Sequence, residues 1–326
     1  MKNLGCAAGS IAVLLAGSAL AQAPATPAYP VKPVRILVGF APGGGIDIVA
    51  RIYAQRLTDS VGQSFIVDNR PGAGGTIATD TLAKAPPDGY TLIMVSVTHS
   101  INASLYSKLP YDTIKAFTPV TPAALQADVI AVHPSLPVKS VRELVALAKT
   151  KPGDVSYAHA GNGTLMHVGM ELFLSMAGIK MLAVPYNGSG PSTVATLGGQ
   201  VPVLSTSLPP SLPHAKAGKL RILAVTTAQR TPLAPEYPTV DEAAGLKGYE
   251  AVVWIGLLAP AGTPAAVVNK LNADVERLQQ TRELREQMAK QGTDPYRDTP
   301  AGFAELIRKD VAKWGKIVHD TGLKAE

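Results

Sequence analysis

A glycine-rich turn, FAPGGGID at residues 40–47, follows the first apolar segment of the chain. It separates a run rich in β-branched residues at 34–40 from a stretch with helical periodicity, as expected where a strand leads into a helix. The N–H groups of such a turn and the positive end of the helix dipole suit an anion. The glycine triplet matches neither G-x-G-x-x-G nor a P-loop. The other interpretation is a purely structural turn in which Asp47 satisfies the first helical amides.

The same kind of turn recurs along the chain. Small and polar residues follow apolar runs in four further segments, at 69–80, 96–105, 159–170 and 185–197. A single glycine-rich turn would be weak support for a binding site. Several of them at the carboxyl ends of strands, divided between two domains, predict one shared cleft.

A catalytic site would need a nucleophile beside a base, or a cluster of metal ligands. The histidines are scattered, and the chain has no G-x-S-x-G elbow. His99 and His167 are the strongest candidates for chemistry because both fall in candidate cleft turns. We expect a binding protein with no catalytic residue, no metal and no cofactor. The alternative is an exported enzyme that acts on a small acid through His99 or His167 with Asp47.

Apolar segments alternate with helical ones, which is typical of an α/β protein with parallel strands. The strand candidates lie at 34–40, 64–69, 90–97, 128–133, 155–160, 181–186, 201–207 and 220–227. Ser140 and Glu143 form a capping-box pattern before a helix. Thr263-Pro264 and Thr299-Pro300 each predict a helix with threonine as its cap and proline at its first position.

The length of 326 residues favours two domains over one. The last predicted helix places apolar residues at helical spacing, from Phe303 to Val318, and should pack back on the first domain. We therefore expect domain 1 to comprise residues 34–124 and 250–326, and domain 2 to comprise residues 125–249.

Residues 1–23 have the features of an export signal. Lys2 precedes a short apolar core, and cleavage after Ala21 or Ala23 fits the small-residue pattern. Residues 24–33 are proline-rich and predict an extended linker. The only cysteine, Cys6, lies in the signal, so the mature chain would contain no disulfide. We expect a periplasmic protein.

The formal charge of +6 comes from basic residues that are dispersed along the chain. Nucleic-acid binding favours basic residues clustered with aromatic ones, but the chain has only 5 Phe, 10 Tyr and 2 Trp. We therefore expect no nucleic acid among the partners. The mild positive balance favours small anions.

Several motifs together resemble a known family. They include VRILVGFAPGGGIDIVAR, VDNRPGAGGTIATD, YAHAGNGTLMHVGMELF, VPYNGSG and GLLAPAGTPAAVVNKLN. In this order they resemble the substrate-binding proteins of tripartite tricarboxylate transporters, the Bug family, over residues 29 to 323. The resemblance implies an α/β two-domain periplasmic binding protein of type II (Venus flytrap), with mixed sheets flanked by helices and a two-strand hinge. Such a protein closes on a small carboxylate.

The resemblance also implies which residues hold the ligand, largely through backbone N–H groups and bridging water. The implied ligand-binding residues are Phe40, Ala41, Gly43, Gly44, Asp47, Thr98 and His99 from domain 1, and Gly161, Asn162, Thr164, Tyr186, Ser205, Thr206 and Ser207 from domain 2.

Two departures from the family pattern bear on the ligand. Ile46 stands where many members have Thr or Ser, so an apolar contact would replace a hydroxyl. Leu204-Ser205-Thr206 lacks the acid that would contact an amino group. We therefore expect a small organic carboxylate without an ammonium group, such as a dicarboxylate, a tricarboxylate or an aromatic acid.

The implied partners are the membrane subunits of a tripartite tricarboxylate-type transporter, to which a monomer would deliver its ligand. The alternative is a co-receptor that senses the ligand and contacts the periplasmic domain of a sensor kinase. The sequence does not separate transport from sensing, because both need the same closed form.

Overall fold

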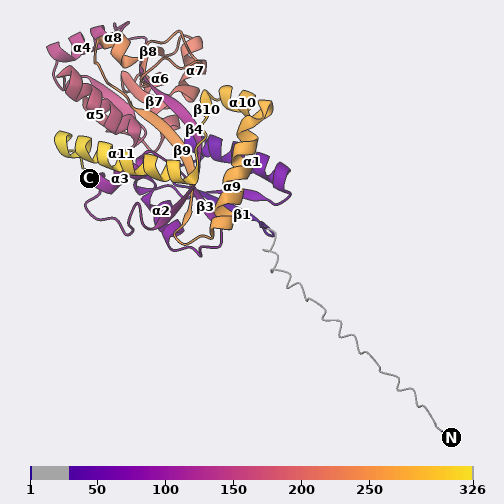
Figure 1. Cartoon of the computed structure of the whole chain (residues 1–326). Coiled ribbons are helices and arrows are strands. Elements are labelled where there is room, and N and C mark those ends of the chain that lie inside the picture. Colours follow the sequence, from indigo (N-terminus) through magenta and orange to yellow (C-terminus); the bar gives the residue numbers. More distant parts are fainter. Residues whose placement is uncertain (2–28, 325–326) are drawn as a thin grey trace.

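Two long antiparallel strands connect the two halves of the molecule (Figure 1). They are β4 (Phe117–Val132) and β9 (Val252–Pro260), in a computed structural model that describes Met1 and residues 29–324. The first part of β4 pairs with β9 and with β10 (Thr293–Pro295), and its last residues pair with β7 (Val203–Ser207) and β8 (Arg221–Val225). The strands therefore form one continuous sheet in the order β2-β1-β3-β9-β4-β7-β5-β6.

The first lobe is built on three parallel strands, with β1 (Val34–Val38) between β2 (Phe65–Asn69) and β3 (Thr91–Ser96). Antiparallel β9 pairs with β3. The helices of this lobe are α1 (Gly45–Val61), α2 (Thr76–Ala83), α3 (Thr98–Leu105), α9 (Ala265–Gln280) and α10 (Arg282–Ala289), with a short 3₁₀ turn η1 (Ala73–Gly75).

The second lobe, at the top of Figure 1, contains β7 and β8 together with β5 (Ser156–His159), which lies parallel to both β7 and β6 (Leu182–Pro185). Its helices are α4 (Val141–Thr150), α5 (Leu165–Ala177), α6 (Ser189–Leu197), α7 (Leu208–Lys216) and α8 (Val240–Ala244).

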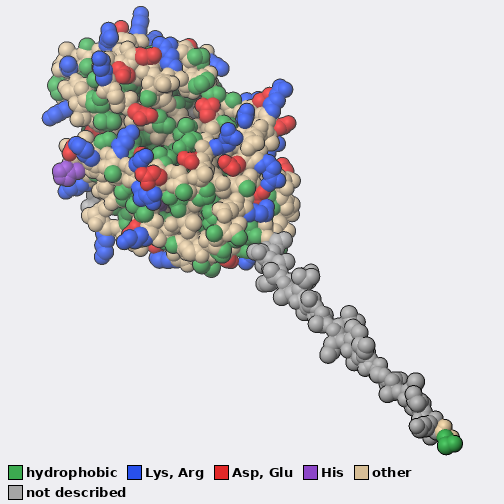
Figure 2. Space-filling view, in the orientation of Figure 1, with side chains coloured by type: hydrophobic (Ala, Val, Ile, Leu, Met, Phe, Trp, Pro, Cys, Tyr) green, Lys and Arg blue, Asp and Glu red, His purple; other side chains and the backbone are tan. Residues whose placement is uncertain are grey.

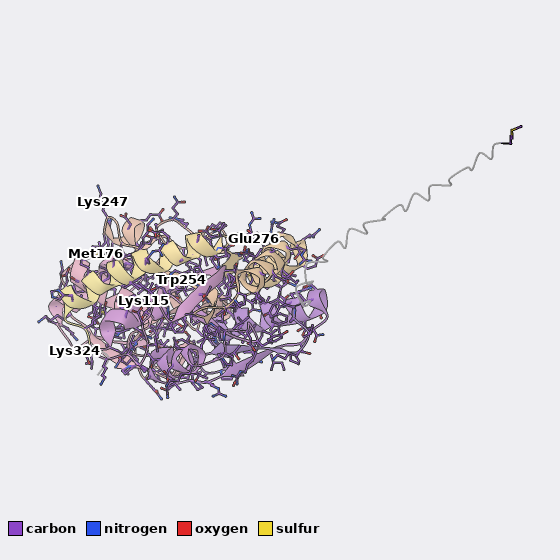
Figure 3. All side chains as sticks on the ribbon, turned by 60° about the horizontal axis from the view of Figure 1, so that its bottom comes forward. Lys115, Met176, Lys247, Trp254, Glu276 and Lys324 are labelled. Carbon is purple, nitrogen blue, oxygen red and sulfur yellow. The ribbon has the colours of Figure 1, made fainter. Side chains whose placement is uncertain are left out.

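The last helix, α11 (Pro300–Thr321), packs against α3 of the first lobe and also contacts α5 of the second (Figure 1). Its buried face includes Phe303, Ile307, Trp314 and Val318. Trp254 on β9 donates its indole N–H to Asp310 of this helix. Trp254 lies inside the molecule beside α11, whereas Lys247 and Lys324 lie at its edge (Figure 3).

The predicted fold class, an α/β protein with mixed sheets flanked by helices, is confirmed. The domain boundaries at 124/125 and 249/250 stay a prediction. The predicted signal peptide apart from Met1, and residues 24–28 of the predicted linker, lie outside the described residues. None of the described helices is long and apolar enough to cross a membrane.

The helix N-caps that the sequence predicts can be compared with the structure one by one. Ser140 accepts a bond from the amide of Glu143, as predicted, although the Glu143 carboxylate accepts from Lys139 rather than from Ser140. Thr299 caps α11 by accepting from Gly302. The cap predicted at Thr263 is wrong. Its hydroxyl donates to Pro260 instead, and α9 begins without a side-chain cap.

Basic side chains do not gather on the face shown in Figure 2, where Lys and Arg are interspersed with Asp and Glu. This distribution agrees with the dispersed basic residues of the sequence.

A buried acid lies where β4 passes from one lobe to the other. Asp128 is 1% exposed, and neither carboxyl oxygen has a hydrogen-bond partner among the described residues. Its backbone is held by Thr226, whose amide donates to the Asp128 carbonyl and whose hydroxyl accepts from the Asp128 amide. Burial raises the pKa of Asp128 to about 8, because the charged form loses its hydration.

This pKa predicts a pH-dependent stability. The folded protein holds the Asp128 proton more tightly than the unfolded chain, so its stability falls as pH rises from about 4 to about 8. Asp128→Asn removes this loss. Between these pH values, the free energy of unfolding of Asp128→Asn minus that of the native protein should increase with pH, by up to about 1.4 kcal/mol per pH unit. Urea unfolding at pH 5, 6.5 and 8 measures the difference, and a difference that stays constant with pH would contradict the prediction.

Candidate functional site

A cavity of about 200 Å³ lies between the two lobes. One wall is formed by residues 40–46, which lead into α1, and the opposite wall by residues 187–191 at the start of α6. Gln126 of β4 and Val253 of β9 line it as well, and Ala160, Met166 and Ser207 complete the lining. Every one of these residues is uncharged.

The start of α1 presents backbone donors to the cavity. Gly43 has a φ of +86°, which favours glycine, and Gly44 is the N-cap, with no side-chain hydrogen bond to the helix. The amides of Gly44, Gly45 and Ile46 have no acceptor among the residues that the structure describes. The first N–H groups of a helix have no intrahelical partner, so they are available to an anion.

The start of α6 presents donors from the other side. Its N-cap, Gly188, has a φ of +119° and no capping side chain. The amides of Ser189 and Gly190 lack an acceptor within the described chain. The N-termini of two helices from different lobes therefore line one small cavity. Both helix dipoles favour negative charge there.

Asp47 holds the first of these turns in place. Its carboxylate is 2% exposed and accepts hydrogen bonds from the Gly43 amide at 2.9 Å, Arg51 Nε at 2.9 Å and Asn69 Nδ2 at 2.8 Å. Burial alone would raise the pKa of Asp47, but the bonds from Arg51, Gly43 and Asn69 outweigh it and hold the pKa below its ordinary value. The structure thus places Asp47 behind the turn rather than in the cavity lining.

A second, wider hollow adjoins the cavity. Phe40, Ala41, Ala160 and Asn187 line both spaces. The wider hollow, of about 690 Å³, is also lined by the predicted residues Gly161, Asn162 and Tyr186. Of the other predicted ligand-binding residues, Phe40, Ala41, Gly43, Gly44 and Ser207 line the inner cavity. The structure therefore brings eight of the predicted residues to these two adjoining hollows, which together are called the cleft below.

Other predicted residues lie outside this lining. Thr98 and His99 border a separate space of about 20 Å³ behind Phe40. Thr164 donates to the Gly161 carbonyl and Ser205 donates to the Met166 carbonyl, each at 2.7 Å, so both hold segments that line the cleft. Thr206 is fully buried.

His99 packs within the first lobe. Its Nε2 donates to the Thr113 carbonyl at 3.0 Å, and its ring lies edge-on to Phe117. Burial lowers the pKa of His99 to about 4, so the imidazole is neutral at neutral pH.

His167 helps to hold the loop before α5, part of which lines the cleft. It stacks on His159, with ring centroids 4.4 Å apart, and the two Nδ1 atoms accept the amides of Gly163 and Gly161 respectively. Burial lowers the pKa of His167 to about 4. Burial and the neighbouring His167 lower that of His159 to about 3. Both rings are therefore neutral acceptors that hold the loop before α5.

The cavity is also lined by residues that are not among the predicted ligand-binding ones, including Gln126, Met166, Asn187, Ser189 and Val253. Asn187 and Ser189 belong to a turn that the sequence did single out. A polar residue within the apolar run LQADVIAV was the available signal for Gln126. Met166 and Val253 carry no signal, because nothing distinguishes an apolar cleft residue from a core residue by type.

The family model described as "Tripartite tricarboxylate transporter family receptor" matches residues 49–323. BugT of Bordetella pertussis (strain Tohama I) is 34% identical over 316 residues, which cover 96% of this chain and 97% of BugT.

Solved structures match over nearly the same range. An R. palustris protein solved with adipate is 36% identical, with a TM-score of 0.87 over 91% of this chain and 99% of that one. MatC from Rhodopseudomonas palustris, with bound malate, is 32% identical, with a TM-score of 0.83 over 89% and 100%. The periplasmic binding protein BugD is 31% identical, with a TM-score of 0.85 over 91% and 99%. The fold is that of the two-lobed periplasmic binding proteins, and the chain belongs to the receptor family of the tripartite tricarboxylate transporters, which includes the Bug proteins.

Proposed function

We propose that this chain captures a small organic carboxylate between its two lobes and delivers it to the membrane subunits of a tripartite tricarboxylate-type transporter. The observation that carries the proposal is the pair of helix N-termini, those of α1 and α6, which line one cavity from opposite lobes. Each supplies amides without an acceptor among the described residues.

The chemistry of the lining favours an anion that is held by dipoles. Burying a carboxylate is costly unless hydrogen bonds replace its hydration. Each hydrogen bond to a charged group contributes about 1.5 to 3 kcal/mol, so a few amides from each helix start would offset that cost. The binding of adipate and of malate by two similar proteins supports this class of ligand.

The side chains that line the cavity also indicate which groups the ligand carries besides its carboxylate. Its lining residues include Ile46, Met166, Pro191 and Val253, but they include no carboxylate. A ligand ammonium group would have no ionic partner there, whereas a methylene chain would meet apolar side chains. We therefore favour an acid without an ammonium group.

Domain closure would make the binding selective. A ligand that contacts α1 and α6 together favours the closed form, because one of the two sets of contacts is lost when the lobes separate.

The proposal includes export to the periplasm through residues 1–23, with cleavage after Ala21 or Ala23, and action as a monomer. A sensory co-receptor would use the same closed form. Deletion of the gene would then abolish a transcriptional response but leave ligand uptake intact.

Calorimetric titration of the protein, purified without refolding, with adipate, malate, aspartate and the neutral diamide of adipate tests the ligand class. We expect an organic acid to bind and the diamide to bind far more weakly, because the diamide has no negative charge for the helix dipoles. Native mass spectrometry of the untreated protein should show a co-purified acid that is chemically unchanged. Selective tight binding of aspartate, or equal binding of acid and diamide, would count against the proposal.

Gly44 allows the cavity itself to be tested. Its backbone has an ordinary φ of −78°, and an added Cβ would meet only the Ala41 carbonyl, at 3.7 Å. Gly44→Leu should therefore fold, with a loss of stability of about 1 kcal/mol or less for the altered N-cap. Its side chain should fill the cavity and weaken the binding of the acid by about 100-fold or more, or roughly 3 kcal/mol.

Gly198→Leu serves as the matched control. Gly198 is exposed at the far end of α6, also has an ordinary φ, and has only carbonyl oxygens at 3.5 and 3.7 Å from an added Cβ. Titration and urea unfolding of both variants separate binding from stability. Unchanged affinity in Gly44→Leu would remove this cavity from the proposal.

A further inference from the structure

Gln126 occupies a distinctive place at the floor of the cleft. It lies on β4 between two neighbouring strands, opposite Val253 of β9 and Thr293 of β10. Its side chain borders the inner cavity and is 2% exposed. The backbone that carries this side chain is thus fixed from both sides, at the strand that both lobes share.

The carboxamide of Gln126 lies against the first residue of α1. A Cβ added to Gly45 would come within 2.5 Å of Oε1 and 2.7 Å of Nε2 of Gln126. No L side chain fits at position 45 while Gln126 stays in place. The third glycine of the APGGG turn therefore makes room for this carboxamide beside the free amides of α1.

The Gln126 amide nitrogen is unpaired among the residues that the structure describes. This atom, Nε2, is enclosed. Leaving a buried donor unpaired costs about 1 to 3 kcal/mol. Gln279 shows the contrast, because the two hydrogens of its Nε2 have four acceptors within reach, namely Tyr53 Oη and the Pro122, Ala123 and Tyr296 carbonyls.

We propose that Gln126 is a specificity-determining residue of the cleft, and that its carboxamide donates a hydrogen bond to the ligand carboxylate that binds at the N-terminus of α1. This inference rests on the proposed function. A half-turn about the last side-chain torsion exchanges the amide nitrogen and oxygen, so the NH₂ group can face the cavity without any movement of the backbone. A carboxylate oxygen accepts several bonds and can take this one together with those from the α1 amides.

The competing explanation is that Gln126 only fills space next to Gly45. Methionine is an unbranched side chain of similar length, so Gln126→Met keeps the packing and removes the donor. A space-filling role predicts unchanged ligand affinity in this variant. A donor role predicts weaker binding of an acid with no loss of stability, because no internal hydrogen bond is removed.

The experiment compares the native protein with Gln126→Met and with the matched control Gln279→Met. Each is titrated with adipate and with the neutral diamide of adipate, and each is unfolded with urea in the absence of ligand. For Gln126→Met we expect adipate to bind about 10- to 100-fold more weakly, a narrower preference for adipate over the diamide, and unchanged or greater stability. For Gln279→Met we expect lower stability and unchanged affinity for adipate, measured below its unfolding transition.

The outcomes separate this inference from the proposed function. If native protein binds adipate and Gln126→Met binds it equally well, Gln126 is not a ligand donor, while the proposed function stands. If Gln126→Met loses stability and affinity together, its role is structural and the inference is overturned. If the native protein binds the diamide as tightly as adipate, the proposed function itself fails.

Discussion

The antiparallel pairing of β4 with β9 is the interaction on which the rest of the structure depends. Both lobes attach to these strands, and the cavity lies where they cross from one lobe to the other. Gln126 and Val253 are direct partners in this pairing, and both line the cavity. The register shifts between β4 and β9 fall in the segment that contains Pro119 and Pro122, where a missing N–H weakens a regular ladder. The floor of the cleft is thus an extended strand pair. Its two walls are the N-terminal ends of helices that belong to different lobes.

The site is built from backbone rather than from charged side chains, which explains how its polar residues are used. Asp47 carries the only carboxylate bonded to the α1 turn within the described residues, and it is directed at Gly43, Arg51 and Asn69. His159 and His167 likewise accept amides from the loop before α5. In each case a side chain fixes the conformation of a loop, and the loop then presents its peptide groups to the cleft. Such donors are preorganised, because they belong to helices whose other turns are already hydrogen-bonded.

Local patterns in the sequence predict the elements well. The glycine turns mark the ends of β1 and β5, Ser140 caps α4, and Thr299 caps α11. The cap at Thr263 fails, because its hydroxyl finds a nearer acceptor in the preceding turn. Local patterns indicate less about which side chains line the cavity. Gln126 and Val253 meet only through a strand pairing across 127 residues of sequence, and periodicity within either segment does not encode that register. His99 lies in a polar turn that favours a place in the cleft, but the packing of Phe117 encloses it.

The uncharged lining has a consequence for what the protein presents once it is loaded. A bound dicarboxylate would bring its negative charge into the cleft, and no lining side chain carries a positive charge to cancel it. Helix dipoles stabilise that charge locally, but they leave the total charge of the complex altered by the charge of the ligand. The empty and loaded forms would therefore differ in the electrostatic field at the mouth of the cleft, in addition to any difference in shape. A membrane partner would have two independent signals by which to recognise a protein with cargo, and only one of them would require the lobes to move.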